Sequence, residues 1–257
     1  MRSVLPSSPV KPRKSAEIVA GRLRRAIVKG DLGKGAMLPV ERDLIESFGV
    51  SRATMREALR ILEAEGLLEV ARGAKGGARV VGPTLALASH AVGMVLQAQD
   101  TELADVQLAR QIIEPPAARL VAERPKRERM QAVASLRANL AEERTLVDAA
   151  EFPFKAMQFH ERLVQLSGNR TLATFLLVLH DIHEGVASSL SAETRLGGSR
   201  VRERTLHYHE RLIHCVADGD GPGAEALWRE YWRWITPYTH PERAVVDVLR
   251  SLGDSDD

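Results

Sequence analysis

One stretch of the chain, LPVERDLIESFGVSRATMREALRILEA at residues 38–64, constrains the fold more strongly than any other. Its pattern predicts a helix, a tight turn at Gly49–Val50 and a second helix that opens at Ser51. Gly49 suits the left-handed residue that ends a helix, and the Ser51 hydroxyl suits an N-cap. Pro39 fits the mouth of the first helix, where its missing N–H is not needed. The stretch therefore predicts two helices joined by a tight turn.

The second of these helices has one apolar face and one polar face. Apolar side chains recur at spacings of four and three, at Met55, Leu59 and Leu62, and we expect them to pack inward. Arg52, Thr54 and Arg56 lie on other faces, near the N-terminal end of the helix. Arginine can bind guanine through two hydrogen bonds, and a helix N-terminus favours phosphate. This pattern is typical of a helix that reads the major groove of DNA.

The charge of the chain is unevenly distributed, although its net value is only +2. The first 82 residues carry 16 basic and nine acidic side chains, whereas the remaining 175 carry 20 basic and 25 acidic ones. A basic front and an acidic rear indicate that only the front meets a polyanion. The length of 257 residues suggests one large or two medium domains, and a hydrophobic content of 44% suffices for a buried core.

The ends of the chain and its single cysteine indicate where it works. Residues 1–14 are basic and lack the apolar core of a secretory signal, so we expect a disordered tail. No apolar run is long enough to span a bilayer, so we expect no membrane partner. Cys215 is the only cysteine, which excludes a disulfide within the chain and favours a cytoplasmic location. Residues 251–257 are expected to form an acidic tail.

Two further elements complete a predicted front domain, residues 15–82. Ser15–Gly30 predicts an amphipathic helix whose inward residues are Ile18, Val19, Leu23, Ala26 and Ile27. The later runs LLEV and ARVV flank ARGAKGG, which predicts a hairpin with a flexible, basic tip. Beside such a helix pair the hairpin would be a wing, with Arg72, Lys75 and the Gly73 backbone near phosphate or the minor groove. An ordinary solvated hairpin is the alternative.

Residues 83–250 are predicted to form a second, all-helical domain. Apolar residues recur at helical spacing in seven segments: Leu85–Leu96, Leu103–Ala122, Met130–Leu146, Phe154–Leu166, Leu172–Leu190, Val201–Ala217 and Ala224–Ile235. Short breaks separate these segments, and no convincing strand follows Thr84. The predicted fold is therefore mainly α: an N-terminal winged helix–turn–helix with a small β-hairpin, followed by an all-α helical bundle.

Several short motifs follow one another in the front domain: a G-x-L-x-x-G turn, an L-P-x-E-R box, a G-V-S-R-x-x-x-R-E-A-L-R helix and an E-G-L start to the wing. In this order they resemble the winged-helix domain of the GntR family of bacterial transcription regulators. The resemblance implies double-stranded DNA as a partner, with contacts at Arg42, Ser51, Arg52, Thr54, Arg56, Arg72 and Gly73. Ala53 replaces a hydroxyl residue that some relatives use, which puts one contact in doubt.

The rear domain carries R-x-x-x-E at residues 110–114, F-H-x-x-L-x-x-x-S-G-N at residues 159–169 and H-E-R-L-I-H-C-V-A-D-G-D at residues 209–220. These strings resemble the helical, FCD-type ligand-binding domain of the FadR branch of the same family. The resemblance implies that this domain binds a small-molecule effector and forms a homodimer, which places two winged helices on a palindromic operator. We therefore expect a ligand-responsive, sequence-specific regulator that acts as a repressor or an activator, with repression favoured.

Many members of this branch resemble one another in a buried metal site made by one aspartate and three histidines. His160 and His209 occupy two of these positions, but Ala156 replaces the aspartate and Tyr231 the last histidine. Two imidazoles are too few for Zn²⁺, which prefers four donors. We expect no metal and no other cofactor. The alternative is Zn or Ni at His160 and His209, helped by His180, His183 or Glu230.

The resemblance also implies an effector pocket in the helical domain, to which we assign Arg110, His160, His209 and Tyr231. A guanidinium inside a helical bundle needs an anion. The partner of Arg110 is either Glu114, one turn further on, or a carboxylate or phosphate of the ligand. The effector is expected to be a small carboxylate or a larger acyl-type acid.

Two other functions compete with regulation. A metal-dependent enzyme in the helical domain, with secondary DNA binding, is the alternative; the chain has no H-E-x-x-H motif, nucleophile elbow or phosphate loop to support it. A protein that packages DNA without sequence preference is disfavoured by the acidic rear domain. We therefore predict a regulator that is not an enzyme.

Overall fold

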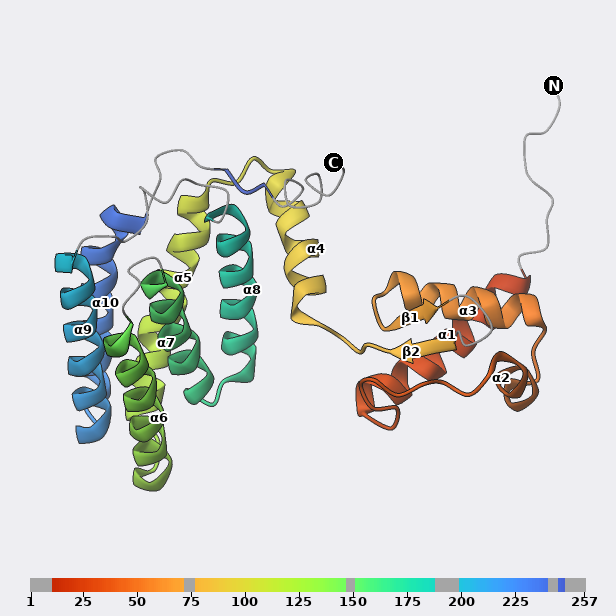
Figure 1. Ribbon diagram of the computed structural model, residues 1–257, viewed down its shortest axis with the longest axis horizontal. Coiled ribbons are helices and arrows are strands. Elements are labelled where there is room, and N and C mark those ends of the chain that lie inside the picture. Colours follow the sequence, from red (N-terminus) through yellow and green to blue (C-terminus); the bar gives the residue numbers. More distant parts are fainter. Residues whose placement is uncertain (1–10, 72–76, 147–150, 188–198, 240–244, 248–257) are drawn as a thin grey trace. The chain divides into compact units, whose positions relative to one another are not determined.

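The computed structural model describes residues 11–71, 77–146, 151–187, 199–239 and 245–247. The chain divides into two compact units, Met1–Leu87 and Ala88–Asp257 (Figure 1). Each unit has its own hydrophobic core. The first unit combines helices with a two-stranded sheet, whereas the described part of the second is built from helices. This confirms the predicted fold class.

Before α4 begins at Leu85, the described part of the first unit contains three helices and a hairpin. Its elements are α1 (Lys11–Lys29), α2 (Glu41–Phe48), α3 (Arg52–Ala64), β1 (Leu68–Ala71) and β2 (Gly77–Val80). Helix α3 packs against α1 through its buried residues Met55, Ala58, Leu59 and Leu62. The apolar spacing in the sequence therefore marks the packing face of α3, and leaves its other face free.

Helix α1 differs from its prediction in two ways. It begins at Lys11, four residues before the predicted start at Ser15. Ile18 was predicted to face inward, but its side chain is 53% exposed. Val19, Leu23 and Ile27 are buried as predicted, Ala16 is buried with them, and their spacing of three and four residues follows the helical period. Ile18 lies outside this stripe, so the prediction for that residue was wrong.

The turn between α2 and α3 is formed as its sequence predicts. Gly49 adopts the left-handed conformation with a φ of 63°, which a residue with a Cβ rarely adopts. The Ser51 hydroxyl accepts a hydrogen bond from the Thr54 backbone N–H at 3.2 Å and so caps α3. Pro39 lies before α2 rather than in its first turn, because the helix begins at Glu41 with Val40 as its N-cap.

The hairpin pairs β1 and β2 in antiparallel register, with Leu68 opposite Val80 and Ala71 opposite Gly77. Leu68, Ala78 and Val80 face the core of the first unit, which joins the hairpin to the helices. Arg72 and Gly73, the predicted wing contacts, and Lys75 lie outside the described residues. The existence of the hairpin is confirmed, while the contacts at its tip stay predictions.

Seven helices follow the hairpin in the described residues: α4 (Leu85–Gln97), α5 (Leu103–Ala122), α6 (Lys126–Thr145), α7 (Phe152–Leu166), α8 (Arg170–Ala187), α9 (Ser199–Asp218) and α10 (Gly221–Thr239). Each corresponds to one of the predicted helical segments. Residues 245–247 lie beside the start of α5, where the Val246 N–H donates to the Thr101 carbonyl at 2.9 Å.

Helix α5 is central to the helical unit. It packs against α7, α8, α9 and α10, and α6 packs against α7 and α9 (Figure 1). The main core contains large buried side chains such as Phe159, Leu212 and Trp228. Within this apolar surrounding, α5, α7 and α9 also bury the polar residues Glu114, His160 and His209. Burial of such groups is costly unless they are paired, so their contacts indicate a candidate site.

Candidate functional site

The first candidate site is the exposed face of α3. Arg52 and Arg56 are exposed and lie one turn apart, outside the buried stripe that includes Met55 and Leu59. Arg60, a further turn on, is exposed as well. The row begins at the capped N-terminus of α3, where the helix dipole favours negative charge. The arrangement suits a helix that presents guanidinium groups to nucleic acid.

The arginines at this end of α3 and on the neighbouring α2 make only weak ion pairs with nearby carboxylates. Arg52 Nε lies 3.7 Å from Glu41 Oε1, and Arg42 Nε lies 3.5 Å from Asp43 Oδ1. The side chains of Arg42 and Arg52 are 86% and 77% exposed, so these contacts contribute little to stability. Both guanidinium groups therefore remain available to a polyanion.

Ser51 and Thr54 have a local role that competes with DNA contact. Besides capping α3, the Ser51 Oγ lies 2.9 Å from the Thr54 Oγ1, within hydrogen-bond distance. Ser51 is exposed and Thr54 is half-buried, so only Ser51 fully faces solvent. Of the predicted contacts, the structure brings Arg42, Ser51, Arg52, Thr54 and Arg56 to α2 and the start of α3.

The second candidate site is a buried polar cluster in the helical unit, made by Arg110, Glu114, Glu143, His160, His180, His209 and Tyr231. Its centre is the fully buried carboxylate of Glu114. One oxygen of this carboxylate, Oε2, lies 2.5 Å from His160 Nδ1. The same oxygen accepts hydrogen bonds from the indole N–H groups of Trp228, at 3.0 Å, and Trp232, at 3.3 Å. Three donors thus hold one carboxylate oxygen inside the bundle.

Arg110 lies beside Glu114 in this buried polar cluster. Its guanidinium donates to Gln107 Oε1 at 3.0 Å and lies 3.6 Å from Glu114 Oε1. It also lies over the ring of Trp232, 5.0 Å from the centroid. Arg110 Nε and Glu114 Oε1 are both buried without a hydrogen-bond partner among the described residues. The guanidinium is therefore neutralised by Glu114, and part of its hydrogen-bonding capacity remains unused.

The structure brings His160, His209 and Tyr231 together, as the family resemblance predicts. Ring centroids lie 5.7 Å apart for His160 and His209, and 5.3 Å apart for His160 and Tyr231. His209 stacks on Phe159 at 3.9 Å, and its Nδ1 lies 2.8 Å from Glu143 Oε2. All of these side chains are buried, so the group is an internal site rather than a surface one.

Burial and pairing set the charge states in the buried polar cluster. Burial lowers the pKa of His160 and, more strongly, that of His180, so both imidazoles are neutral near pH 7. Burial alone would raise the pKa of Glu114, but His160, Arg110 and the Trp228 N–H together hold that pKa below its usual value. The ionised Glu114 and the charged Arg110 are the fixed charges at the centre.

Sequence reasoning missed part of this buried polar cluster. Glu143 was not predicted, although it lies seven residues after the buried Leu136 and three after the buried Leu140, and so belongs to the apolar stripe of α6. Glu114 was considered only as a partner for Arg110, whereas it also binds His160 and two tryptophans. His180 was expected to be a solvated or packing residue, or at most a substitute metal ligand. Glu114 and Glu143 could both have been predicted as buried polar residues, because each is a charged residue on the apolar stripe of its helix.

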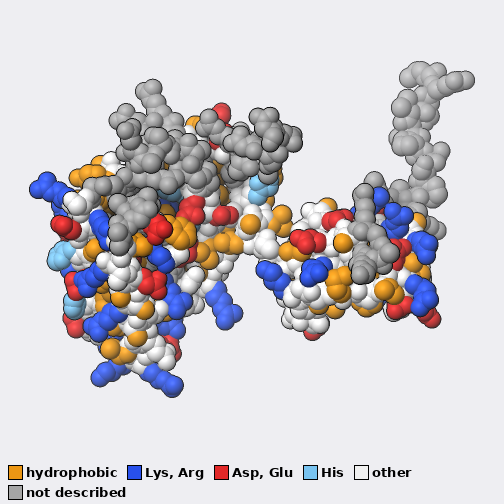
Figure 2. All heavy atoms as spheres, in the orientation of Figure 1, with side chains coloured by type: hydrophobic (Ala, Val, Ile, Leu, Met, Phe, Trp, Pro, Cys, Tyr) orange, Lys and Arg blue, Asp and Glu red, His pale blue; other side chains and the backbone are white. Residues whose placement is uncertain are grey.

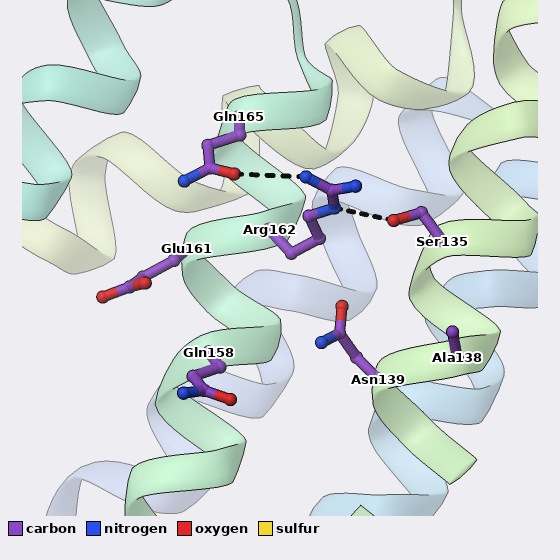
Figure 3. Close-up of a pocket in the computed structure, with 7 residues that line it drawn as sticks. All are labelled: Ser135, Ala138, Asn139, Gln158, Glu161, Arg162 and Gln165. Carbon is purple, nitrogen blue, oxygen red and sulfur yellow. Dashed lines mark hydrogen bonds between the residues drawn. The ribbon is translucent and has the colours of Figure 1, made fainter. Parts of the chain in front are cut away.

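A polar pocket of about 390 Å³ lies between α6 and α7 (Figure 3). Arg162 spans it by donating to Ser135 Oγ at 2.6 Å and lying near Gln165 (Figure 3). Glu161, which also lines the pocket, lies 3.1 Å from His180 Nδ1 through one of its oxygens. His180 Nε2 in turn lies 3.9 Å from Glu114 Oε1. Glu161 is thus the residue that connects this pocket with the buried polar cluster.

Comparison with known families identifies the class of protein. Residues 15–80 match the family of bacterial regulatory proteins of the gntR type, and residues 105–233 match the FCD domain. The second match covers half of the chain. The chain belongs to the GntR family of transcription regulators and carries an FCD domain behind its DNA-binding domain.

Individual relatives support the same class. The chain is 27% identical over 208 residues to the transcriptional repressor NanR of Klebsiella aerogenes, covering 79% of this chain and 74% of that protein. It is 27% identical over 221 residues to the Uxu operon transcriptional regulator of Escherichia coli, covering 82% and 81%. These relatives are regulators of transcription, and the function predicted from sequence, a ligand-responsive DNA-binding regulator, is confirmed at this level.

A solved structure supports the fold. A GntR protein of Streptococcus agalactiae matches 86% of this chain and 99% of its own length, with a TM-score of 0.63 and 23% identity. Among the described residues, no helix is both long and apolar enough to cross a bilayer. Within the same residues, no group of three or more His, Cys, Asp or Glu side chains is arranged to hold a metal ion.

Proposed function

We propose that α3 is the helix that reads DNA, with Arg52 and Arg56 against base edges in the major groove. The observation that carries this proposal is the row of exposed arginines behind the capped N-terminus of α3. Arg42 and Ser51 lie near that end and would contact the backbone phosphates. Thr54 and the wing residues Arg72 and Gly73 complete the proposed interface.

We propose that the regulator binds a palindromic operator as a homodimer, and that α5 and α8 carry the dimer interface. Leu108 and Ile112 on α5 are 53% and 65% exposed, and Phe175 on α8 is 57% exposed. These two helices pack against each other within one chain. Large apolar side chains gathered on neighbouring helices are typical of a surface that another protein covers. A second copy would cover them and hold two DNA-binding units side by side.

Dimer formation can be tested by sedimentation. Ile112→Arg would place a charge in the proposed interface and convert the dimer to a monomer at micromolar concentration. Met130→Arg, at a 44% exposed position on α6, is the matched control and would leave the dimer intact. A dimer that persists in the Ile112 variant would exclude this face.

We propose that an organic acid in the helical unit shifts the regulator between two states with different DNA affinity. Arg110 is the anchor for the acid, since its buried guanidinium keeps an unused N–H. His160, His209 and Tyr231 would line the same site. The proposal assigns the chain to the FadR branch, places it in the cytoplasm with its DNA and involves no catalytic step.

The reading of DNA is tested with binding sites selected from chromosomal fragments. Arg52→Ala is expected to weaken specific binding by about 1–3 kcal/mol, or about 5- to 150-fold in Kd, if the residue grips a base. Arg137→Ala removes an exposed arginine on α6 and serves as the control. Unchanged affinity of the Arg52 and Arg56 variants in fluorescence anisotropy would remove α3 from the proposal.

The effector is tested by native mass spectrometry of freshly purified protein, which reports a bound small molecule and the oligomeric state together. A co-purified carboxylic acid, lost in Arg110→Lys, would support the proposed anchor, because lysine cannot reproduce the geometry of a guanidinium. Retention of the acid by a folded Arg110→Lys variant would move the site elsewhere.

A further inference from the structure

Many members of the branch that this chain resembles hold a metal at four positions. The side chains at these four positions do not fit a metal in this chain. His160 and His209 are present, Ala156 is buried one turn before His160 on α7, and Tyr231 lies beside both histidines. The Ala156 methyl group offers no donor atom. Two imidazoles are too few for Zn²⁺, which prefers four ligands. The geometry around these positions nevertheless retains a feature of metal centres.

Both histidines keep a carboxylate on the ring nitrogen that would face away from a metal. His160 Nδ1 lies 2.5 Å from Glu114 Oε2, and His209 Nδ1 lies 2.8 Å from Glu143 Oε2. A carboxylate in this position fixes the tautomer with the proton on Nδ1, which leaves the lone pair on Nε2, and it raises the basicity of a metal-binding imidazole. Glu114 and Glu143 are almost wholly buried, so their carboxylates are held in place and fix the orientation of the His160 and His209 rings.

The two Nε2 atoms have different surroundings. His209 Nε2 is buried without a hydrogen-bond partner among the described residues. His160 Nε2 lies 3.3 Å from the Tyr231 hydroxyl. Since the proton of His160 is directed to Glu114, Nε2 accepts, and Tyr231 donates its O–H. A phenol is protonated near pH 7, so Tyr231 has this proton to donate.

We propose that the Tyr231 hydroxyl takes the place of a metal ion at His160, and that this chain keeps the outer carboxylates of a metal site without its ion. The O–H of Tyr231 engages the Nε2 lone pair that a cation would need. Glu114 and Glu143 still orient His160 and His209 as ligands. Two substitutions, Ala156→Asp and Tyr231→His, would therefore be enough to complete a set of four ligands.

The test is a gain of metal binding in the full-length chain. Ala156→Asp combined with Tyr231→His is expected to retain about one equivalent of Zn²⁺ per chain after incubation and desalting, measured by elemental analysis. The unchanged chain, treated identically, is expected to retain less than about 0.1 equivalent. Adding His160→Ala to the double variant is the matched control and should abolish retention. Far-UV circular dichroism checks that each variant is folded.

Two results would overturn the proposal. In the first, the unchanged chain retains about one equivalent of Zn²⁺, and His160→Ala abolishes this retention. The Tyr231 phenol would then not have replaced the ion. The second is a folded double variant that retains no more metal than the unchanged chain, because the outer carboxylates would then not be poised for a metal. Neither measurement involves DNA or an effector, so the outcome is independent of the proposed regulation.

A second measurement does not depend on metal binding. Nitrogen-15 NMR of the unchanged chain distinguishes the two neutral tautomers of an imidazole, and His160→Gln assigns the His160 signals by their loss. We expect the His160 proton on Nδ1 and a hydrogen-bonded, unprotonated Nε2. A proton on Nε2 would overturn the proposal even if the double variant did not fold, because Tyr231 could then not donate to that atom.

Discussion

The two units of the chain place their charged side chains in opposite ways. In the first unit, the arginines of α3 face solvent and have weak partners, while in the second unit Arg110, Glu114 and Glu143 are buried and tightly contacted. On the visible face of the helical unit, basic and acidic side chains are interspersed without a large patch of either sign (Figure 2). The first unit therefore exposes arginines that a partner can bind, whereas the second uses buried charges within its own core.

The largest expected effect comes from the centre of the buried polar cluster. Glu114→Gln keeps the size of the side chain but leaves Arg110 and the neighbouring donors without their buried anion. We expect the free energy of unfolding of the helical unit to fall by about 3–5 kcal/mol. All three tryptophans, Trp228, Trp232 and Trp234, lie in α10, so tryptophan fluorescence during urea unfolding reports this unit.

An exposed ion pair is the control for this measurement. Glu142 contacts Lys155 at 3.1 Å, but its side chain is 58% exposed. Glu142→Gln should change the free energy of unfolding by less than about 1 kcal/mol. If the two glutamate variants were equally stable, the contrast between exposed and buried charge would not hold for this protein.

The next effect in size is a difference in pH dependence between the units. Burial lowers the pKa of His160 and of His180 in the folded state, whereas the unfolded chain binds these protons near the ordinary value of about 6.5. Below that pH the unfolded state therefore binds more protons than the folded state, and stability decreases as the pH falls. We expect the helical unit to lose about 1–3 kcal/mol between about pH 7.5 and pH 5.5.

The first unit offers an internal comparison, because residues 1–87 contain no histidine. Hydrogen exchange of α3 amides should therefore change little over the same pH interval after correction for the intrinsic rate. His214→Gln, at an exposed position of α9, should leave the pH dependence of the helical unit intact. A helical unit whose fluorescence transition is unaffected by pH would show that His160 and His180 are not buried as neutral groups.

The contrast between the units also explains how much the sequence could predict. The exposed face of α3 followed from the spacing of Met55, Leu59 and Leu62, because a helical period fixes which residues face the core. The convergence of His160, His209 and Tyr231 followed only from the family resemblance. The pairing of Glu143 with His209 joins residues 66 positions apart, and no local pattern specifies such a contact. Ile18 shows the limit even for a helix, since an apolar residue beside the buried stripe can remain exposed.

A smaller effect is expected at the start of α3. Ser51→Ala removes the hydroxyl that accepts from the Thr54 N–H and should cost about 0.5–2 kcal/mol of local stability. Hydrogen exchange by mass spectrometry of the full-length chain would detect faster exchange in α3. Ser51→Asp keeps an acceptor and should preserve protection, so equal exchange in both variants would show that the cap is not needed.

The smallest effect separates phosphate contact from base reading. Arg42→Ala removes an 86% exposed guanidinium whose ion-pair partner among the described residues is Asp43, at 3.5 Å, so stability should be unaffected. We expect it to weaken binding to all DNA sequences about equally and to reduce the slope of log K against log salt by about 1. Arg127→Ala on α6 is the control with the same loss of charge and should leave the slope unchanged. If Arg42→Ala altered the ratio of specific to nonspecific affinity and not the slope, Arg42 would be a base-reading residue, and the recognition surface would extend from α3 onto α2.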